Sequence, residues 1–174
     1  MKILSSLLLL AWLVALPAAQ RPRALGAEEI GAIAQILMLE DTRVFEVAAL
    51  EHLLQSTHPE VRRRAVVAVG RIIDPRGAAL LRPLRSDKDP EVLGAVAFAC
   101  GQLKDATAVE WLASRMNRSN APVVAREAAR SLGKIRSPEA QMALGQFLTV
   151  APVNRVSAPV VAKPSSHLSI LQSG

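Results

Sequence analysis

A pattern that recurs every 31 or 32 residues constrains the fold of this chain more than any other feature. Each copy has a Pro, a Gly and four apolar residues at matching places. The three copies are Pro59, Val61, Ala65, Gly70, Ile72 and Leu81; Pro90, Val92, Val96, Gly101, Leu103 and Leu112; and Pro122, Val124, Ala128, Gly133, Ile135 and Leu144. One period upstream only the apolar places remain, as Ile30, Ala34 and Leu50. A period of about 20 to 50 residues is typical of solenoids, in which each unit buries its apolar face against its neighbours.

The spacing of the apolar residues predicts two helices in each copy. Ile30, Ile33, Ala34, Leu37 and Met38 follow the i, i+3, i+4, i+7 rule of an amphipathic helix, so we expect this stripe to be buried. The copies that begin at a Pro repeat this spacing, and Pro is well suited to the first position of a helix. We therefore predict an all-α, right-handed α-solenoid of about four two-helix repeats.

The Gly of each copy lies inside the first helix of its repeat. A Gly within a helix lowers stability by about 0.5–1 kcal/mol relative to Ala, so its recurrence at Gly70, Gly101 and Gly133 needs a reason. We expect the next helix to approach so closely that a Cβ would collide with it.

A residue that can cap the second helix follows fifteen residues after each Pro place. These residues are Asp74, Asp105 and Ser137, and their side-chain oxygens can accept hydrogen bonds from the free backbone N–H groups at a helix start. Each repeat is therefore expected to consist of a helix, a tight turn, a second helix and a loop.

The chain divides into four parts of different composition. We expect a signal peptide at residues 1–19, a linker at 20–27, the solenoid at 28–148 and a Pro- and Ser-rich linker or tail at 149–174. The four repeats are expected at about 28–58, 59–89, 90–120 and 121–148. A single short strand within the tail is the alternative for the last part.

The first residues have the pattern of a secretory signal. Lys2 precedes an apolar run from Ile3 to Leu16, and Pro17, Ala18 and Ala19 follow it. The run is short for a helix that crosses a hydrocarbon core of ~30 Å, so cleavage near Ala19 is expected and an uncleaved anchor is the alternative. The protein is predicted to be exported, periplasmic or secreted, with no stable membrane span once the signal is removed.

The repeats resemble the HEAT class, in the short bacterial form that is named after phycobilisome lyases. Its unit reads Asp-Pro-x-Val-Arg, then Ala-Ala-x-Ala-Leu-Gly-x-Ile. Here His58-Pro59-Glu60-Val61-Arg62 leads to Gly70-Arg71-Ile72, and Asp89-Pro90-Glu91-Val92 leads to Gly101-Gln102-Leu103. The resemblance covers about residues 28–148, but His58 and Ala121 replace the Asp, and Leu93 and Ala125 replace the Arg. It implies a protein-binding solenoid; a bilin lyase is not expected, because no pigment site is visible.

A narrower resemblance concerns the start of the solenoid. Leu39-Glu40-Asp41-Thr42-Arg43, ahead of such repeats and behind a signal peptide, is similar to the N-terminal region of exported bacterial proteins that carry a cyclophilin-type prolyl isomerase domain. The resemblance implies that this chain corresponds to the non-catalytic HEAT region of such an enzyme. That reading is the alternative to a free-standing scaffold.

No catalytic or metal-binding pattern emerges from the polar residues. His52 and His58 are six residues apart, which is not a ligand spacing on a helix, and no nucleophile motif accompanies them. Cys100 lies at a packing place beside Gly101, where burial should raise the pKa of its thiol. We expect no catalytic residue, no metal and no cofactor.

Basic residues offer the best candidates for binding. The chain has a formal net charge of +6, and Arg63, Arg71, Arg126, Arg130 and Lys134 occupy related places in the second and fourth repeats. The third repeat has Gly94 and Gln102 there, and aromatic residues for base stacking are absent, so nucleic acid is not expected. These residues either contact an anionic partner or surface, or form a solvated face.

One aromatic residue, Trp111, stands where the other repeats have Leu80 and Ala143. It is a candidate partner anchor or a filler between repeats. The favoured function is a non-enzymatic, monomeric protein-interaction scaffold of the bacterial cell envelope, whose protein partners the sequence does not identify.

Overall fold

The chain folds into consecutive helical pairs that stack side by side. The computed structural model describes residues 24–150, so the expected signal peptide at 1–19 and residues 151–174 of the expected tail lie outside the described residues. The helices are α2 (Ala27–Thr42), α3 (Val47–Leu54), α4 (Pro59–Ile72), α5 (Gly77–Leu81), α6 (Pro90–Gln102), α7 (Val109–Arg118), α8 (Pro122–Ile135) and α9 (Pro138–Val150), with 3₁₀ turns at Pro83–Ser86 and Ala106–Ala108. The described residues contain no strand. The predicted all-helical solenoid is confirmed.

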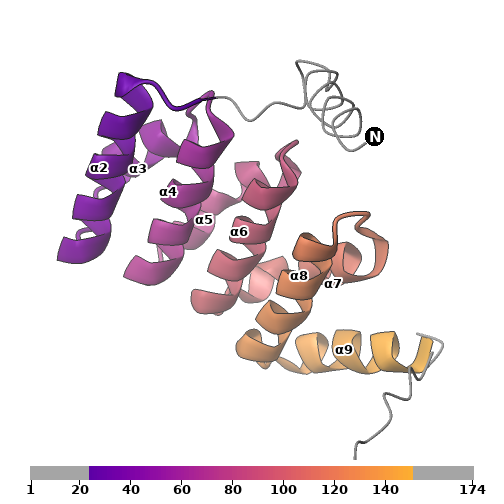
Figure 1. Ribbon diagram of the computed structural model, residues 1–174. Coiled ribbons are helices and arrows are strands. Elements are labelled where there is room, and N and C mark those ends of the chain that lie inside the picture. Colours follow the sequence, from indigo (N-terminus) through magenta and orange to yellow (C-terminus); the bar gives the residue numbers. More distant parts are fainter. Residues whose placement is uncertain (1–23, 151–174) are drawn as a thin grey trace, which may run out of the picture.

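The helices form two layers (Figure 1). The first helices of the repeats, α2, α4, α6 and α8, stand next to one another in one row, and α3, α5 and α7 lie behind them. The last helix, α9, runs sideways from the foot of α8 and away from the row. Because α2 and α8 are the two outermost members of the front row, each has a neighbouring first helix on one side only.

Local signals start and stop the front-row helices. α4, α6 and α8 begin with Pro, and Asp89 caps α6 by accepting hydrogen bonds from the backbone N–H groups of Glu91 (2.8 Å) and Val92 (3.2 Å). Each of the four front-row helices is followed, directly or after one further residue, by a residue in the left-handed conformation. None of these four residues is Gly. They are Arg43, Ile73, Lys104 and Arg136, with φ between 51° and 61°.

The predicted capping residues all accept backbone hydrogen bonds, but only Ser137 does so directly ahead of a second α-helix. Asp105 caps the 3₁₀ turn that precedes α7, and Asp74 lies in the turn before α5, whose N-cap is Arg76. Asp74 accepts a hydrogen bond from the backbone N–H of Arg76 at 2.9 Å, and Asp105 accepts one from that of Thr107 at 2.9 Å. Ser137 accepts one from the backbone N–H of Ala140 at 3.2 Å. Each oxygen thus satisfies a donor that a turn or the start of a helix leaves free.

Close approach explains two of the three recurring glycines. A Cβ at Gly70 would lie 2.9 Å from the Cα of Ala99, and one at Gly101 would lie 2.5 Å from Oγ and 2.9 Å from Cα of Ser131. Both neighbours belong to the next helix of the front row. The prediction is wrong for Gly133, where a Cβ would meet nothing within 4 Å. No further front-row helix stands beyond α8 among residues 24–150.

The prediction that the apolar stripe of α2 is buried is also wrong. Ile30, Leu37 and Met38 are 58%, 53% and 58% exposed, and the helix is buried instead through Ile36 and Leu39. The corresponding stripes of α4 and α6 are buried, because a preceding first helix covers them. The spacing was interpreted correctly for the interior repeats, but α2 has no described helix before it.

Polar side chains link successive repeats. Arg62 of α4 donates two hydrogen bonds to Asp87, at 2.8 and 3.0 Å, and both side chains are largely buried. Arg85 pairs with Asp105 at 2.6 Å, and the indole N–H of Trp111 donates to the Arg85 carbonyl oxygen at 3.0 Å. Trp111 therefore ties the second repeat to the third. Asp87 supplies the partner for Arg62, since Asp89 is used as a helix cap.

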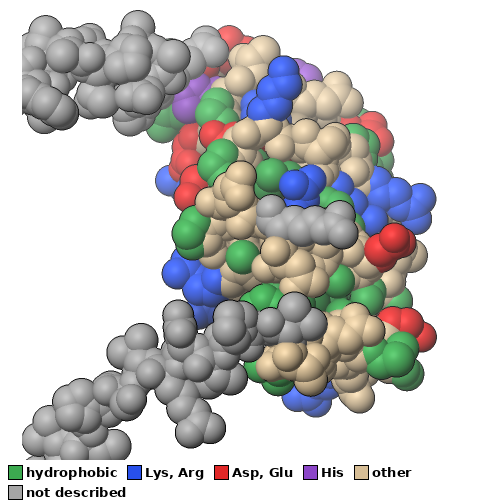
Figure 2. Space-filling view, turned by 90° about the vertical axis from the view of Figure 1, so that its right-hand side faces the viewer, with side chains coloured by type: hydrophobic (Ala, Val, Ile, Leu, Met, Phe, Trp, Pro, Cys, Tyr) green, Lys and Arg blue, Asp and Glu red, His purple; other side chains and the backbone are tan. Residues whose placement is uncertain are grey.

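The end of the row formed by α8 and α9 has a mixed surface. Figure 2 looks onto the end formed by α8 and α9 and shows groups of Lys and Arg side chains among hydrophobic ones. No helix within residues 24–150 is long and apolar enough to cross a membrane.

Candidate protein-binding groove

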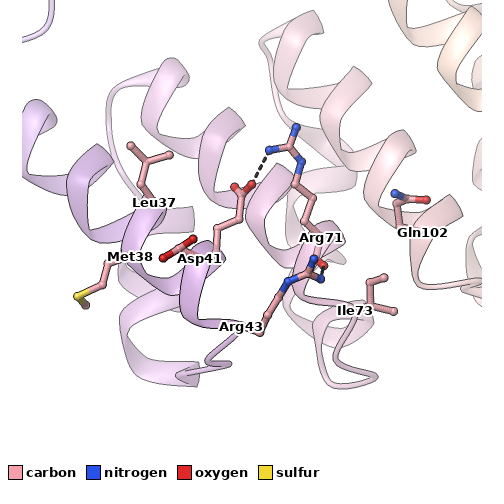
Figure 3. Close-up of a pocket in the computed structure, with 8 residues that line it drawn as sticks. Leu37, Met38, Asp41, Arg43, Arg71, Ile73 and Gln102 are labelled. Carbon is pink, nitrogen blue, oxygen red and sulfur yellow. Dashed lines mark hydrogen bonds and ion pairs between the residues drawn. The ribbon is translucent and has the colours of Figure 1, made fainter.

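A groove lies across the carboxyl ends of α2, α4 and α6 (Figure 3). It has a volume of about 930 Å³. Its lining comes from three repeats: Leu37, Met38, Glu40, Asp41, Arg43, Arg71, Ile73 and Gln102. A site of this kind exists only because the helices stand in a row, since Leu37 and Gln102 are far apart in the sequence.

The groove combines apolar side chains with charged ones. Leu37, Met38 and Ile73 each expose more than half of their surface, which is unusual for three large apolar residues that line one hollow. Ile73 occupies the left-handed position after α4, so its side chain projects away from the core. These residues can bury an apolar side chain of a partner.

An ion pair divides this surface. The guanidinium of Arg71 contacts the Glu40 carboxylate, and Arg43 donates a hydrogen bond to the Arg71 carbonyl oxygen (Figure 3). The side chain of Arg71 remains 55% exposed. The pair therefore leaves Arg71 accessible to a second acidic group.

A smaller hollow of about 370 Å³ continues the groove toward α8. It shares Gln102 with the first hollow, and Lys104, Lys134 and Arg136 supply its charge. These three residues form no ion pair with any residue from 24 to 150; the Lys134 ammonium lies 5.0 Å from the centre of the Phe98 ring. The second hollow is therefore basic.

The position of the basic residues has an electrostatic cause. The carboxyl ends of parallel helices α2, α4, α6 and α8 point to the same edge, where unsatisfied carbonyl groups carry partial negative charge. Arg43 and Arg136 directly follow α2 and α8, and Lys104 comes two residues after the end of α6. Arg71 and Lys134 lie in the last turns of α4 and α8. Cations at these places stabilise the helices and at the same time make the edge attractive to anions.

The structure brings together only two of the six residues that the sequence suggested for binding. Arg71 lines the first hollow and Lys134 the second. Arg63 forms a two-pronged pair with Glu60 at 2.8 Å, and Arg130 pairs with Glu127 at 3.4 Å. Arg126 is exposed on α8 outside both hollows.

Trp111 lies away from the groove, in the back layer. Its side chain is half-buried, packs against the core and is held by the hydrogen bond to Arg85 and by the guanidinium of Arg115, 5.6 Å from its ring. Its contacts are those of a residue that joins repeats.

Sequence reasoning missed Arg43, Lys104 and Arg136. Lys104 and Arg136 directly follow Leu103 and Ile135, the last apolar places of their first helices, so the repeat carries a signal for these two. The residues predicted to bind all lie within helices, whereas Arg43, Lys104 and Arg136 lie just after a helix end. The exposed apolar side chains were missed for a different reason, since Leu37 and Met38 were expected in the core.

The structure also bears on metal binding and on the role of Cys100. No group of three or more His, Cys, Asp and Glu residues within 24–150 could hold a metal ion. Cys100 is fully buried, and this burial raises the pKa of its thiol to about 11. The prediction that Cys100 serves as a small buried apolar residue is confirmed.

Fold and groove together define a class: this is an α-solenoid of helical hairpins that presents an extended mixed surface. A family model for HEAT repeats matches residues 78–162. The chain is therefore a HEAT-repeat protein, as its repeat pattern implied. HEAT repeats commonly mediate protein–protein interactions. No curated protein matches the chain.

Proposed function

We propose that this protein is a non-enzymatic interaction scaffold of the bacterial cell envelope, and that it binds a protein partner in the groove over the carboxyl ends of its front-row helices. One observation carries the proposal. Exposed Leu37, Met38 and Ile73 line a hollow together with Arg43, and the adjoining hollow is lined by Lys104, Lys134 and Arg136; none of these four basic residues forms an ion pair with an acidic residue of the described chain. A folded surface of this kind gains stability when a partner covers it.

The lining indicates the chemistry of the partner. An extended or helical segment would match both hollows. Its apolar side chain would contact Leu37, Met38 and Ile73, and its acidic side chains would pair with Lys104, Lys134 and Arg136. Glu40 and Asp41 in the same groove would repel a phosphate backbone at its α2 end. A protein with an acidic, partly apolar segment therefore suits the groove better than nucleic acid does.

Placement in the cell envelope rests on the amino-terminal sequence. The charged start, short apolar run and small residues before Gln20 favour export. Fractionation of cells that produce the full chain tests it: the processed protein should appear in the periplasmic or extracellular fraction, and exclusive recovery from the cytoplasm would reject this part of the proposal. Membership in a longer exported prolyl isomerase stays a prediction from the resemblance.

A charge-reversal experiment tests the groove. The double variant Arg43→Glu, Lys104→Glu changes two groove residues, and Arg82→Glu, Lys88→Glu is the matched control, because both control residues are exposed, unpaired within residues 24–150 and outside both hollows. Partners captured from periplasmic extract by the wild type would be identified and then titrated as purified proteins. We expect the groove variant to bind them about tenfold or more weakly, as two lost charge pairs predict, and the control to bind normally.

Unchanged affinity of the groove variant would contradict the proposal, provided that its circular dichroism and melting temperature match those of the control. Equal losses in both double variants would point to a general effect of net charge instead, and would also contradict a specific groove.

A further inference from the structure

The first helices of the row contact one another through a repeating interface. The helices at its two ends, α2 and α8, each leave one side of that interface exposed. Inside the row, the contacts of α4 with α6 and of α6 with α8 each fit a small residue against a Gly. Ala99 of α6 fits against Gly70 of α4, and Ser131 of α8 fits against Gly101 of α6. The outward side of α2 and the outward side of α8 lack such a neighbour among residues 24–150.

The outward side of α2 is apolar. The repeat places Ile30, Ala34 and Leu37 in register with Val61, Ala65 and Ala68 of α4, each 31 residues later, and all three α4 residues are fully or almost fully buried. On α2 the same places are exposed, with Ile30 at 58% and Leu37 at 53%. α2 thus shows the stripe that an interior helix buries against the helix before it.

The outward side of α8 shows the complementary half. Gly133 is in register with Gly70 and Gly101, yet a Cβ there would meet nothing within 4 Å. The next helix, α9, exposes Met142 (59%), Phe147 (37%) and Leu148 (72%), of which Met142 lines a hollow with Thr107 and Glu110 on the α7 side. In Figure 1, α9 extends away from the row from the foot of α8, so the two helices form a corner.

The charges of the two end helices are opposite. α2 carries Glu28, Glu29, Glu40 and Asp41 and has no basic residue, whereas α8 carries Arg126, Arg130 and Lys134 against a single acidic residue, Glu127. The register reinforces this contrast. Arg63 of α4 interacts electrostatically with Glu91 of α6, and the corresponding residues at the two ends are Arg126 and Glu29.

We propose that a second copy of this chain stacks head to tail, with α2 of one copy packed against α8 and α9 of the other. Leu37 of one copy then lies over Gly133 of its neighbour, the apolar stripe of α2 covers the corner between α8 and α9, and the acidic face of α2 meets Arg126 and Lys134. The contact uses different surfaces on the two copies. It therefore leaves one free end of each kind, and further copies can add in the same way.

A stacked assembly differs from the monomer expected from the sequence. Stacking goes beyond the proposed function because its contacts centre on the outward sides of α2 and α8, although Leu37, Gly133 and Lys134 also line the two hollows of the groove. The groove would, however, continue from one copy to the next, because Lys134 and Glu40 occupy equivalent places of the row.

Disulfide trapping of the full chain tests the stacking. Leu37→Cys and Gly133→Cys place thiols at the positions that would face each other, and neither change fills occupied space. Cys100 is buried and has a raised thiol pKa, so it does not compete. Under mild oxidation the double variant should form a ladder of dimers, trimers and larger species on a non-reducing gel. A mixture of the two single variants should stop at the dimer.

The matched control pairs Gly133→Cys with Ala48→Cys, an exposed residue of α3 in the back layer. A mixed dimer from Leu37→Cys and Gly133→Cys that is no more abundant than the control dimer overturns the proposal. So does a chain that lacks the expected signal peptide and forms the ladder only after residues 151–174 are removed, because that segment would then be the natural occupant of the end face.

Charge reversal adds an independent measurement. Arg126→Glu should lower the dimer yield several-fold, and pairing it with Glu29→Lys on the other copy should restore much of it; no effect of either change overturns the electrostatic part of the proposal. Ile30 lies outside the groove, so Ile30→Lys should abolish the ladder and leave partner binding intact. The groove variant Arg43→Glu, Lys104→Glu should do the reverse, so failure of one proposal can be told from failure of the other.

Discussion

Individual charged residues in this protein act mainly on their own helix or on the next repeat. Glu60 shows this most clearly, because it lies in the first turn of α4 and accepts hydrogen bonds from Arg63 at 2.8 Å and from Arg64 at 2.6 Å. The bond from Arg63 is the main reason why the pKa of Glu60 falls to about 2, against the effect of partial burial, with Arg64 adding to it. A run of three arginines that appeared suited to a partner is therefore partly engaged within its own helix.

The lowered pKa of Glu60 predicts a pH-dependent contribution to stability. The group has an ordinary pKa of 4.5 in the unfolded chain and about 2 in the folded one, so its contribution is fully present above about pH 4.5 and disappears as the pH falls toward 2. We expect Glu60→Gln to lower the melting temperature at pH 7 and to have almost no effect near pH 2.

Thermal melts of Glu60→Gln and wild type at several pH values measure this difference. Glu110→Gln is the control, because it removes an exposed carboxylate that makes no ion pair within residues 24–150. Equal destabilisation by Glu60→Gln at pH 7 and pH 2 would show that the charge of Glu60 is not the cause.

At the scale of the element, one position of the repeat has different effects in different helices. Gly70 and Gly101 allow α4 to approach α6 and α6 to approach α8, whereas Gly133 has open space in front of it. The three helices have similar length and the same Pro at their start. The neighbour, and not the helix itself, decides whether a Cβ can be tolerated.

Replacing each Gly by Ala separates these effects. In Gly101→Ala the new Cβ would lie 2.9 Å from the Cα of Ser131, so α6 and α8 must move apart, and we expect a loss of about 1–3 kcal/mol in the free energy of unfolding. In Gly133→Ala the Cβ meets nothing, and the better helix propensity of Ala should add about 0.5–1 kcal/mol. Urea denaturation at low protein concentration gives both values. A change of the same sign in both variants would refute the account of the close approach.

At the scale of the whole molecule, stability should vary along the row. A solenoid is stabilised by contacts between neighbouring repeats, so interior helices gain from both sides and end helices from one. α6 has eight buried residues among its 13, and α2 has two among its 16. The end helices therefore depend most on whatever covers them, whether a second copy or another segment.

Hydrogen exchange of the backbone amides can test this gradient. We expect the amides of α6 to exchange most slowly and those of α2 and α9 most quickly in dilute protein, because fewer contacts must break to open an end helix. Stacking of copies should then slow the exchange of α2 as the concentration rises, with little change in α6. Uniform protection along the row at every concentration would contradict nearest-neighbour stabilisation.

Much of this fold follows from the sequence alone. The period of 31 or 32 residues, the Pro starts, the backbone hydrogen bonds accepted by Asp74, Asp105 and Ser137, and the burial of Cys100 were all predictable, because they depend on local backbone preferences and on contacts that every interior repeat makes in the same way. The tertiary structure decided which copies are interior. It exposed the stripe of α2, left Gly133 open and gathered Leu37, Ile73, Lys104 and Lys134 from four helices along one edge. Burial depends on what stands next to a residue, and a repeated pattern is the same whether or not a neighbour is present.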